Sequence, residues 1–192
     1  MEIDGVRVPL DPDSVTWLVY KPSGMVSTMD DPQGRPVVTE LVPSDPVTKP
    51  VGRLDLHSEG LMLLTNDGDL ALYVTHPRYG IEKTYQALMV EPVNARHCKA
   101  LTDGIELEDG TATAKSARIV SAHGGRSLVE IVMTEGRKRE IRRMFDTLGL
   151  TIERLIRVSI GSITDRSLTS GSYRALTNDE IRSLYALAAK IP

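Results

Sequence analysis

The feature that most constrains the fold of this chain is the apolar run Leu61-Met62-Leu63-Leu64. Gly60 precedes the run, and the turn-forming triplet Asn66-Asp67-Gly68 follows it closely. A short, uninterrupted apolar segment between such punctuating residues is typical of a strand that is buried inside a sheet. We therefore expect this run to form a core strand that ends in a tight turn.

Asp55 lies six residues before this run, just after a break in regular structure that Pro50 and Gly52 mark. A carboxylate on a loop braced by a core strand is held in place and stays accessible, which suits a nucleophile or a general base. The simpler interpretation is that Asp55 caps a backbone group or pairs with Arg53. The local pattern leaves both interpretations open.

The rest of the chain alternates irregularly between strand and helix patterns. We predict further strands at 17–20, 83–90, 112–120, 128–134 and 151–160. We predict helices at 70–74, 93–101 and 138–148, a short helix at 37–42, and a C-terminal helix that a Thr177/Glu180 capping box begins. Gly124-Gly125 indicates a hairpin between two of the strands. This pattern favours an α+β fold with a mixed, largely antiparallel sheet flanked by helices.

Length and composition limit the possible classes of protein. At 192 residues the chain fits one substantial domain, alone or with a small appendage. A net charge of −3 argues, taken alone, against a nucleic-acid ligand, and an aromatic content of 4% argues against broad stacking platforms for single strands.

Cysteine and histidine usage narrows the chemistry further. The single cysteine, Cys98, excludes an internal disulfide and a multi-thiolate zinc site, and the four histidines lack metal-ligand spacing. No apolar run is long enough to span a bilayer and no signal-peptide pattern is present. We therefore expect a soluble cytoplasmic protein without a metal site or a membrane partner.

A basic segment stands out against the acidic average. Five of the seven residues from Arg137 to Arg143 are basic, and Arg154 and Arg157 follow. We expect Arg139, Arg142 and Arg143 to project together from one side of the predicted helix, where guanidinium groups could bind phosphates. The alternative is a solvated helix face on which Arg142 pairs with Asp146. Charge alone does not decide between the two.

Five blocks of sequence, taken in order, resemble a known family. They are 52–55, 60–68, Lys83-Thr84-Tyr85, 135–145, and Leu155-Ile156-Arg157 with Ile160-Gly161. Together they resemble the RsuA family of rRNA pseudouridine synthases, which includes RluB, RluE and RluF. The resemblance extends from about Trp17 to about Leu184 and implies the pseudouridine synthase fold. It also implies an enzyme that converts a uridine of rRNA to pseudouridine and needs no cofactor.

The resemblance implies roles for individual residues. Asp55 aligns with the catalytic aspartate of the family, Arg142 with the arginine that pairs with it, and Tyr85 with the tyrosine that stacks on the target base. From the residues alone, Tyr85 would be a strand tyrosine that packs against a neighbouring strand. We expect the substrate-binding residues to be Lys21, Arg53, Lys83, Arg137, Lys138, Arg139, Ile141, Arg143 and Arg157. Glu140 stands where many relatives carry Gln, and we expect it to face away or to pair with Arg137.

The resemblance also implies a domain organisation and a substrate, and two other functions compete with the enzyme that it implies. We expect residues 1–14 to form an N-terminal arm or linker, a remnant of an RNA-binding module whose other parts are naturally absent or trimmed, and residues 15–192 to form the catalytic domain. The substrate is expected to be a large-subunit rRNA uridine near the peptidyl-transferase region, modified by a monomer. One alternative is a non-catalytic RNA-binding or ribosome-assembly factor. Another is a glycosidase that uses Glu59 as its second carboxylate.

Overall fold

The computed structural model describes residues 2–3, 6–7 and 13–189 of the chain. Within this part, the strands are β1 (Glu2–Ile3), β2 (Val6–Arg7), β3 (Thr16–Lys21), β4 (Lys49–Val51), β5 (Ser58–Thr65), β6 (Lys83–Met89), β7 (Ile105–Leu107), β8 (Gly110–Ala112), β9 (Ser116–His123), β10 (Arg126–Met133), β11 (Ile152–Ile160), β12 (Ile163–Thr164) and β13 (Tyr173–Ala175). The helices are α1 (Gly68–Thr75), α2 (Ala95–Asp103), α3 (Glu140–Thr147) and α4 (Asn178–Ala189), with the 3-10 helices η1 (Val38–Leu41) and η2 (Pro77–Tyr79).

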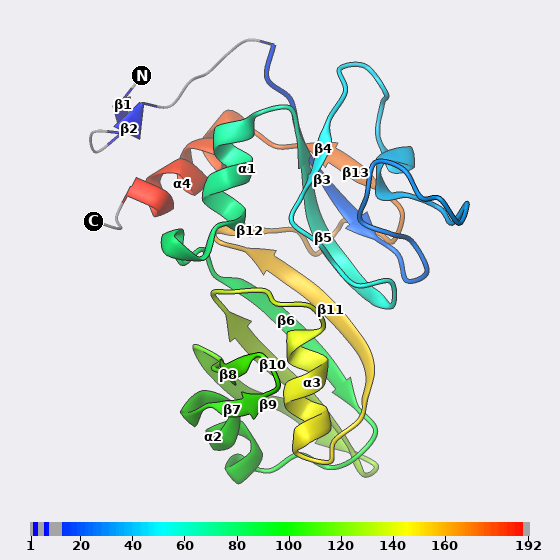
Figure 1. Ribbon diagram of the computed structural model, residues 1–192, viewed down its shortest axis with the longest axis vertical. Coiled ribbons are helices and arrows are strands. Elements are labelled where there is room, and N and C mark those ends of the chain that lie inside the picture. Colours follow the sequence, from blue (N-terminus) through cyan, green and yellow to red (C-terminus); the bar gives the residue numbers. More distant parts are fainter. Residues whose placement is uncertain (1, 4–5, 8–12, 190–192) are drawn as a thin grey trace.

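One sheet organises the molecule (Figure 1). Its strands lie in the order β13-β3-β5-β11-β6-β10-β9, with β4 and β12 paired to β5 and β11 beside this path. Its paired strands run antiparallel except β5 and β11, which run parallel. The sheet is therefore mixed and largely antiparallel, which confirms the predicted class.

The parallel pairing of β5 with β11 depends on Gly60. This residue lies opposite Arg157 and has a φ of +105°. A Cβ atom at this position would lie 2.3 Å from the carbonyl oxygen of Arg157, which no side chain can tolerate. Gly60 therefore allows β11 to lie directly beside the strand that follows Asp55.

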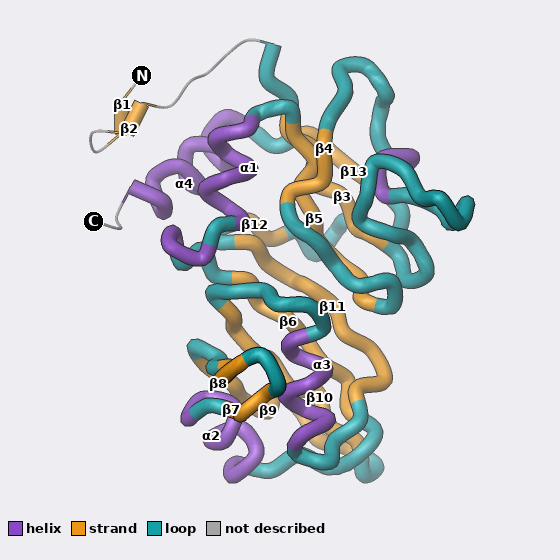
Figure 2. Tube along the Cα trace, viewed as in Figure 1, coloured by secondary structure: helices purple, strands orange, loops and turns teal. Residues whose placement is uncertain are grey.

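Strand β5 is buried on both faces, which explains its uninterrupted apolar run. Leu61 and Leu63 belong to a core covered by α1 and α4, whereas Met62 and Leu64 belong to a second core on the opposite face, with α2 and α3. Figure 2 shows α1 and α4 side by side over one part of the sheet and α3 over another. Both cores thus position β5 and the loop that leads into it.

The predicted helices are present, but their ends differ from the predicted ones by one or two residues: α1 spans 68–75 instead of 70–74, and α2 spans 95–103 instead of 93–101. The Asp67 side chain accepts from Leu70 N at the start of α1, and Thr177 and Glu180 form the expected capping box before α4. The helix predicted at 138–148 begins only at Glu140, because Arg139 has a left-handed φ of 51°. The first turn of the predicted helix is therefore a loop.

Two parts of the chain differ from the predictions or lie beyond them. The β7–β8 hairpin was not predicted, since strands of three residues carry too little pattern to recognise. Within the N-terminal segment, β1 pairs with β2. Residues 4–5 and 8–12 lie outside the described residues, so the boundary at residue 14 stays a prediction.

Candidate active site

Asp55 lies on the loop that connects β4 to β5, at one wall of a cleft. Ser58 N donates to the Asp55 carbonyl at 3.0 Å, so the loop closes in a tight turn just before β5 begins. Ser27 ties the loop to the neighbouring segment, since its hydroxyl donates to Leu54 O at 2.8 Å and accepts from Leu54 N at 3.1 Å. These contacts fix the backbone of Asp55 and leave its half-buried carboxylate free.

The side chain of Lys21 is hydrogen-bonded to the backbone of this loop. Its ammonium group donates to the carbonyls of Pro22, Leu56 and Ser58, at 2.9, 3.4 and 2.8 Å. Burial lowers the pKa of Lys21 to about 8, against the opposing effect of Glu59 and Asp55. The residue is 0% exposed and its ammonium group contacts this loop, so the structure gives the predicted substrate contact of Lys21 no support and it stays a prediction. It is a positioning residue for the loop that carries Asp55.

The cleft has a volume of about 280 Å³ and brings together residues that are far apart in the sequence. Asp55, Tyr85 and Arg142 all line it, as does Ile141. Its further lining residues are Gly52, Arg53, Leu54, Ser58, Thr75, Met133, Glu135, Gly136, Arg137, Lys138, Glu140 and Leu155. The three residues proposed for catalysis therefore share one concave site.

Arg142 projects from the first turn of α3 across the cleft. Its Nη2 donates to His57 O at 3.1 Å and its Nη1 to Ile152 O at 3.4 Å, while its buried Nε has no partner among the described residues. Burial lowers its pKa, and nearby Arg139 adds to this effect. Arg142 interacts electrostatically with Asp55, yet the two form no ion pair. The structure thus places them near each other without the direct pairing that the resemblance implied.

Tyr85 lies on β6 between the cleft and Arg157. The Arg157 guanidinium is 5.9 Å from the centre of the Tyr85 ring, and its Nη1 donates to the Tyr85 hydroxyl at 3.4 Å. Arg157 itself is buried, and its Nε donates to Leu61 O at 2.6 Å. Because strand β11 holds Arg157 and Arg157 contacts Tyr85, the ring orientation is coupled to the central sheet.

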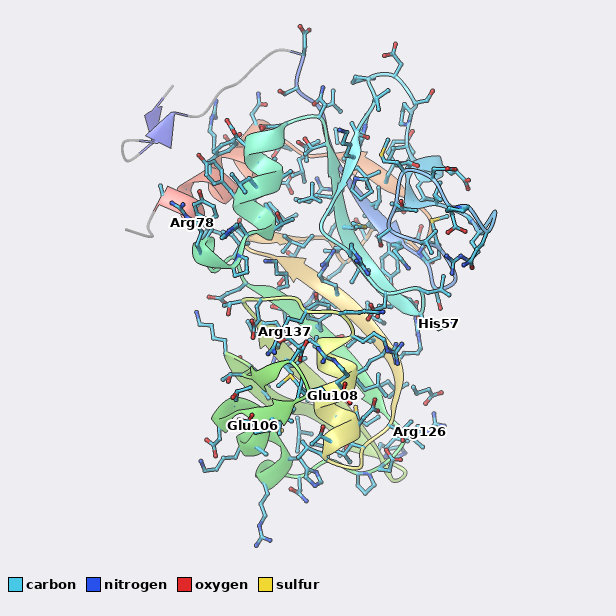
Figure 3. The ribbon with its side chains drawn as sticks, viewed as in Figure 1. His57, Arg78, Glu106, Glu108, Arg126 and Arg137 are labelled. Atoms are coloured by element: carbon cyan, nitrogen blue, oxygen red, sulfur yellow. The ribbon has the colours of Figure 1, made fainter. Side chains whose placement is uncertain are left out.

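The basic segment divides into two groups. Arg143 donates to both carboxylate oxygens of Asp109, at 2.7 and 3.0 Å, and Arg137 contacts the same carboxylate at 3.3 Å. Arg137 also pairs with Glu140, which confirms one of the two expectations for that glutamate. Figure 3 shows Arg137 near the start of α3, above the β7–β8 hairpin. The prediction that Arg139, Arg142 and Arg143 project together is wrong, because Arg143 turns to the hairpin and Arg142 to the cleft.

Three exposed cations near the cleft remain without a carboxylate partner among the described residues. They are Arg53 on the Asp55 loop, and Lys138 and Arg139 just before α3. Arg139 keeps a left-handed backbone, which is strained for a side chain of its kind. These positions suit contacts to a polyanion.

Other chemistries find less support. Glu59, the second carboxylate of the glycosidase alternative, pairs with Arg154 through two hydrogen bonds of 2.8 and 3.0 Å. Among the described residues, no group of three or more His, Cys, Asp and Glu side chains could hold a metal ion. No helix in the described ranges is long and apolar enough to cross a membrane.

Sequence reasoning missed several features of this site. It did not find the role of Lys21 or the pairing of Asp109 with two arginines, since both depend on partners more than 25 residues away. It also missed Leu155, Ser58 and Met133 as lining residues. Leu155 belongs to one of the blocks that carry the resemblance, so it could have been predicted as a residue of the site.

Comparison with known proteins gives a consistent result. The profile of a family described as RNA pseudouridylate synthase matches residues 15–147. An uncharacterized RNA pseudouridine synthase of Mycobacterium leprae is 41% identical over 189 residues, which cover 96% of this chain and 74% of the relative. The ribosomal large subunit pseudouridine synthase B of Bacillus subtilis is 37% identical over 191 residues, covering 98% and 78%. A crystal structure of pseudouridylate synthase superposes with a TM-score of 0.80 at 32% identity, covering 89% of this chain and 74% of that one.

Proposed function

Because the chain belongs to the RNA pseudouridylate synthase family, we propose that it converts a uridine of large-subunit rRNA to pseudouridine with Asp55 as the catalytic carboxylate. The observation that carries this assignment is the cleft in which Asp55, Tyr85 and Arg142 meet. A non-catalytic RNA-binding protein has no physical need for this combination. The arrangement therefore favours the enzyme over the binding factor.

The reaction rearranges the bonds of one nucleotide. The bond between N1 of uracil and C1′ of ribose breaks, the base turns, and a bond between C5 and C1′ forms. C5 loses a proton and N1 gains one, so no net oxidation or group transfer takes place. The protein must supply a carboxylate beside the ribose that attacks C1′ or removes a neighbouring proton. Asp55 has the free carboxylate that both routes require.

Arg142 would keep this carboxylate ionised during the reaction. A nucleotide that fills the cleft displaces water from Asp55, and loss of water favours the protonated acid. A nearby guanidinium group opposes this, because its charge favours the ionised form. Since Arg142 is anchored to two carbonyls rather than to Asp55, the carboxylate stays free to approach the ribose.

Tyr85 would hold the uracil ring. A buried aromatic ring at the cleft wall offers an apolar face to a base that has left its stack. Unstacking costs roughly a few kcal/mol, less in a single-stranded or bulged region. The exposed cations Arg53, Lys138 and Arg139 would bind the backbone around the flipped nucleotide.

We infer the class of rRNA from the name of a similar protein. The Bacillus subtilis protein is named as a large-subunit pseudouridine synthase, and the similarity covers nearly the whole chain. We infer the same class of rRNA for this protein, acting as a monomer in the cytoplasm on ribosomal subunits or their assembly intermediates.

The test is to incubate the protein with large- and small-subunit rRNA transcripts and to map pseudouridine in each. We expect modification at one uridine of the large-subunit RNA and none with Asp55→Asn. Modification only in the small subunit would contradict the substrate assignment. Absence of modification in both, with RNA binding intact, would favour the binding factor.

A further inference from the structure

A second, smaller chamber adjoins the active-site cleft beside Tyr85. It has a volume of about 80 Å³. Six residues line both spaces: Gly52, Arg53, Thr75, Tyr85, Glu135 and Gly136. The chamber is further lined by Val51, Val74, Lys83, Arg157 and Ile160. Three of its side chains are therefore cationic and one is a carboxylate.

The two cations on its strands have hydrogen-bond donors without a partner. The Lys83 side chain, on β6, forms no hydrogen bond or ion pair with any residue that the structure describes. Arg157, on β11, uses two of its nitrogens for Leu61 and Tyr85, while its buried Nη2 has no partner in the described ranges. Buried polar groups are normally hydrogen-bonded, so an unpartnered guanidinium nitrogen points to a ligand.

Like charges make this arrangement costly without a ligand. Burial, and then repulsion by Arg157, lower the pKa of Lys83 to about 8. The single carboxylate of the chamber does not relieve this, because Glu135 contacts Arg137 at 3.4 Å. A negatively charged ligand between Lys83 and Arg157 would relieve the repulsion and complete the hydrogen bonds of both groups.

We propose that this chamber is an oxyanion subsite, formed by Lys83 and Arg157, that binds the backbone phosphate next to the target uridine. The chamber is much smaller than the adjoining cleft, about 80 against about 280 Å³, so it suits a group as small as a phosphate better than a nucleoside. Gly52 and Gly136 line the boundary with the cleft, where the absence of side chains leaves space for an RNA backbone. The choice of an RNA phosphate rests on the proposed function.

The first test uses the wild-type protein and no RNA. Lysines labelled with ¹³C at Cε are followed by NMR, and the Lys83 signal is identified by its loss in Lys83→Arg. We expect inorganic phosphate, against chloride at matched ionic strength, to shift this signal saturably and to raise the titration midpoint of Lys83. Uridine alone should not do so. An unresponsive Lys83 signal, or an equal response to uridine, would overturn the proposal.

The second test measures RNA binding in the Asp55→Asn background, in which turnover does not complicate binding. Each phosphate contact contributes about 0.7–0.9 to the slope of log Kd against log salt. We expect Lys83→Met to lower this slope by about that amount, whereas Lys99→Met, which removes a surface lysine paired with Asp103, leaves it unchanged. Equal slopes for Lys83→Met and its parent would contradict the phosphate assignment. A protein that binds phosphate at Lys83 but modifies no RNA would refute the proposed function and leave the oxyanion site standing.

Discussion

Asp55 and Asp109 are both close to arginines of the segment around α3, yet they behave in opposite ways. Asp109 binds Arg143 through two hydrogen bonds and contacts Arg137, and the bond to Arg143 lowers its pKa. Asp55 interacts with Arg142 only through space. Asp109 therefore neutralises the arginines that it contacts, whereas the charges of Asp55 and Arg142 are not consumed in an ion pair. The comparison shows that a basic sequence becomes a binding surface only where no carboxylate of the protein neutralises it.

The largest expected effect concerns Asp55 itself. Asp55→Asn removes the only group proposed to react with the ribose, so we expect the rate of pseudouridine formation to fall by about 10⁴-fold. The rate is measured by release of tritium from C5 of uridine. Thermal stability should be unchanged, since the Asp55 carboxylate makes no hydrogen bond with any described residue. A fall in melting temperature comparable to that of a core mutant would show that Asp55 is structural.

Arg142 is expected to have the next largest effect. Arg142→Met should lower kcat by about 10²–10³-fold, because the positive charge beside the reacting carboxylate is lost. Arg142→Lys, which keeps a positive charge, should restore part of kcat. A kcat as low in Arg142→Lys as in Arg142→Met would mean that Arg142 acts only through its contacts with His57 and Ile152.

Lys83 is expected to lower the free energy of unfolding at neutral pH. Its pKa is about 8 in the folded protein and 10.5 in an ordinary lysine, so the unfolded chain binds more protons between these values and stability rises with pH. We expect Lys83→Met to be more stable than wild type below pH 8, by at most about 3.4 kcal/mol, and to lose this advantage by about pH 10.5. Denaturant unfolding across this pH range measures the difference. If Lys83→Met were less stable than wild type at pH 7, Lys83 would not be a charged group without a partner.

The smallest effect on turnover is expected for Asp109. Its substitution should strengthen RNA binding rather than weaken it. Asp109→Asn removes the carboxylate that binds Arg143, whereas Arg137 keeps its hydrogen bonds to hairpin carbonyls and its ion pair with Glu140. Because Arg143 is released, RNA affinity should rise and its salt dependence should steepen. Turnover should change by less than about threefold, as expected for an exposed ion pair. Glu108→Gln is the matched control, since Glu108 is the adjacent acid of the same turn and forms no ion pair with a described residue. Equal behaviour of the two variants would mean that only net charge matters.

The sequence was most informative where local pattern and burial agree. The run from Leu61 to Leu64 specifies a strand because both of its faces are buried, and Thr177 with Glu180 specifies a helix start through contacts three residues apart. The resemblance brought Asp55, Tyr85 and Arg142 together correctly as residues of one cleft. Their catalytic roles stay predictions, since no contact in the protein alone tests them.

The sequence was least informative where a charge finds a distant partner. Lys21 looks like a turn lysine, and only the fold shows that its ammonium group lies among carbonyls from residues 56 and 58. Arg137 and Arg143 look like equal members of a basic cluster, and only the unpredicted β7–β8 hairpin brings Asp109 to them. Charge counts therefore predicted a basic surface but not which arginines remain free.

The most direct test of the account uses RNA that carries 5-fluorouridine at the target position. The last bond change requires loss of the C5 hydrogen as a proton, and fluorine cannot leave in that way. We expect wild type to form the new carbon–carbon bond and to leave a rearranged fluorinated nucleotide in the RNA, which liquid chromatography with mass spectrometry separates from 5-fluorouridine after digestion, and Asp55→Asn to form none. Recovery of unaltered 5-fluorouridine from wild type, under conditions in which unsubstituted RNA is modified, would contradict the account, as would equal rearrangement by Asp55→Asn.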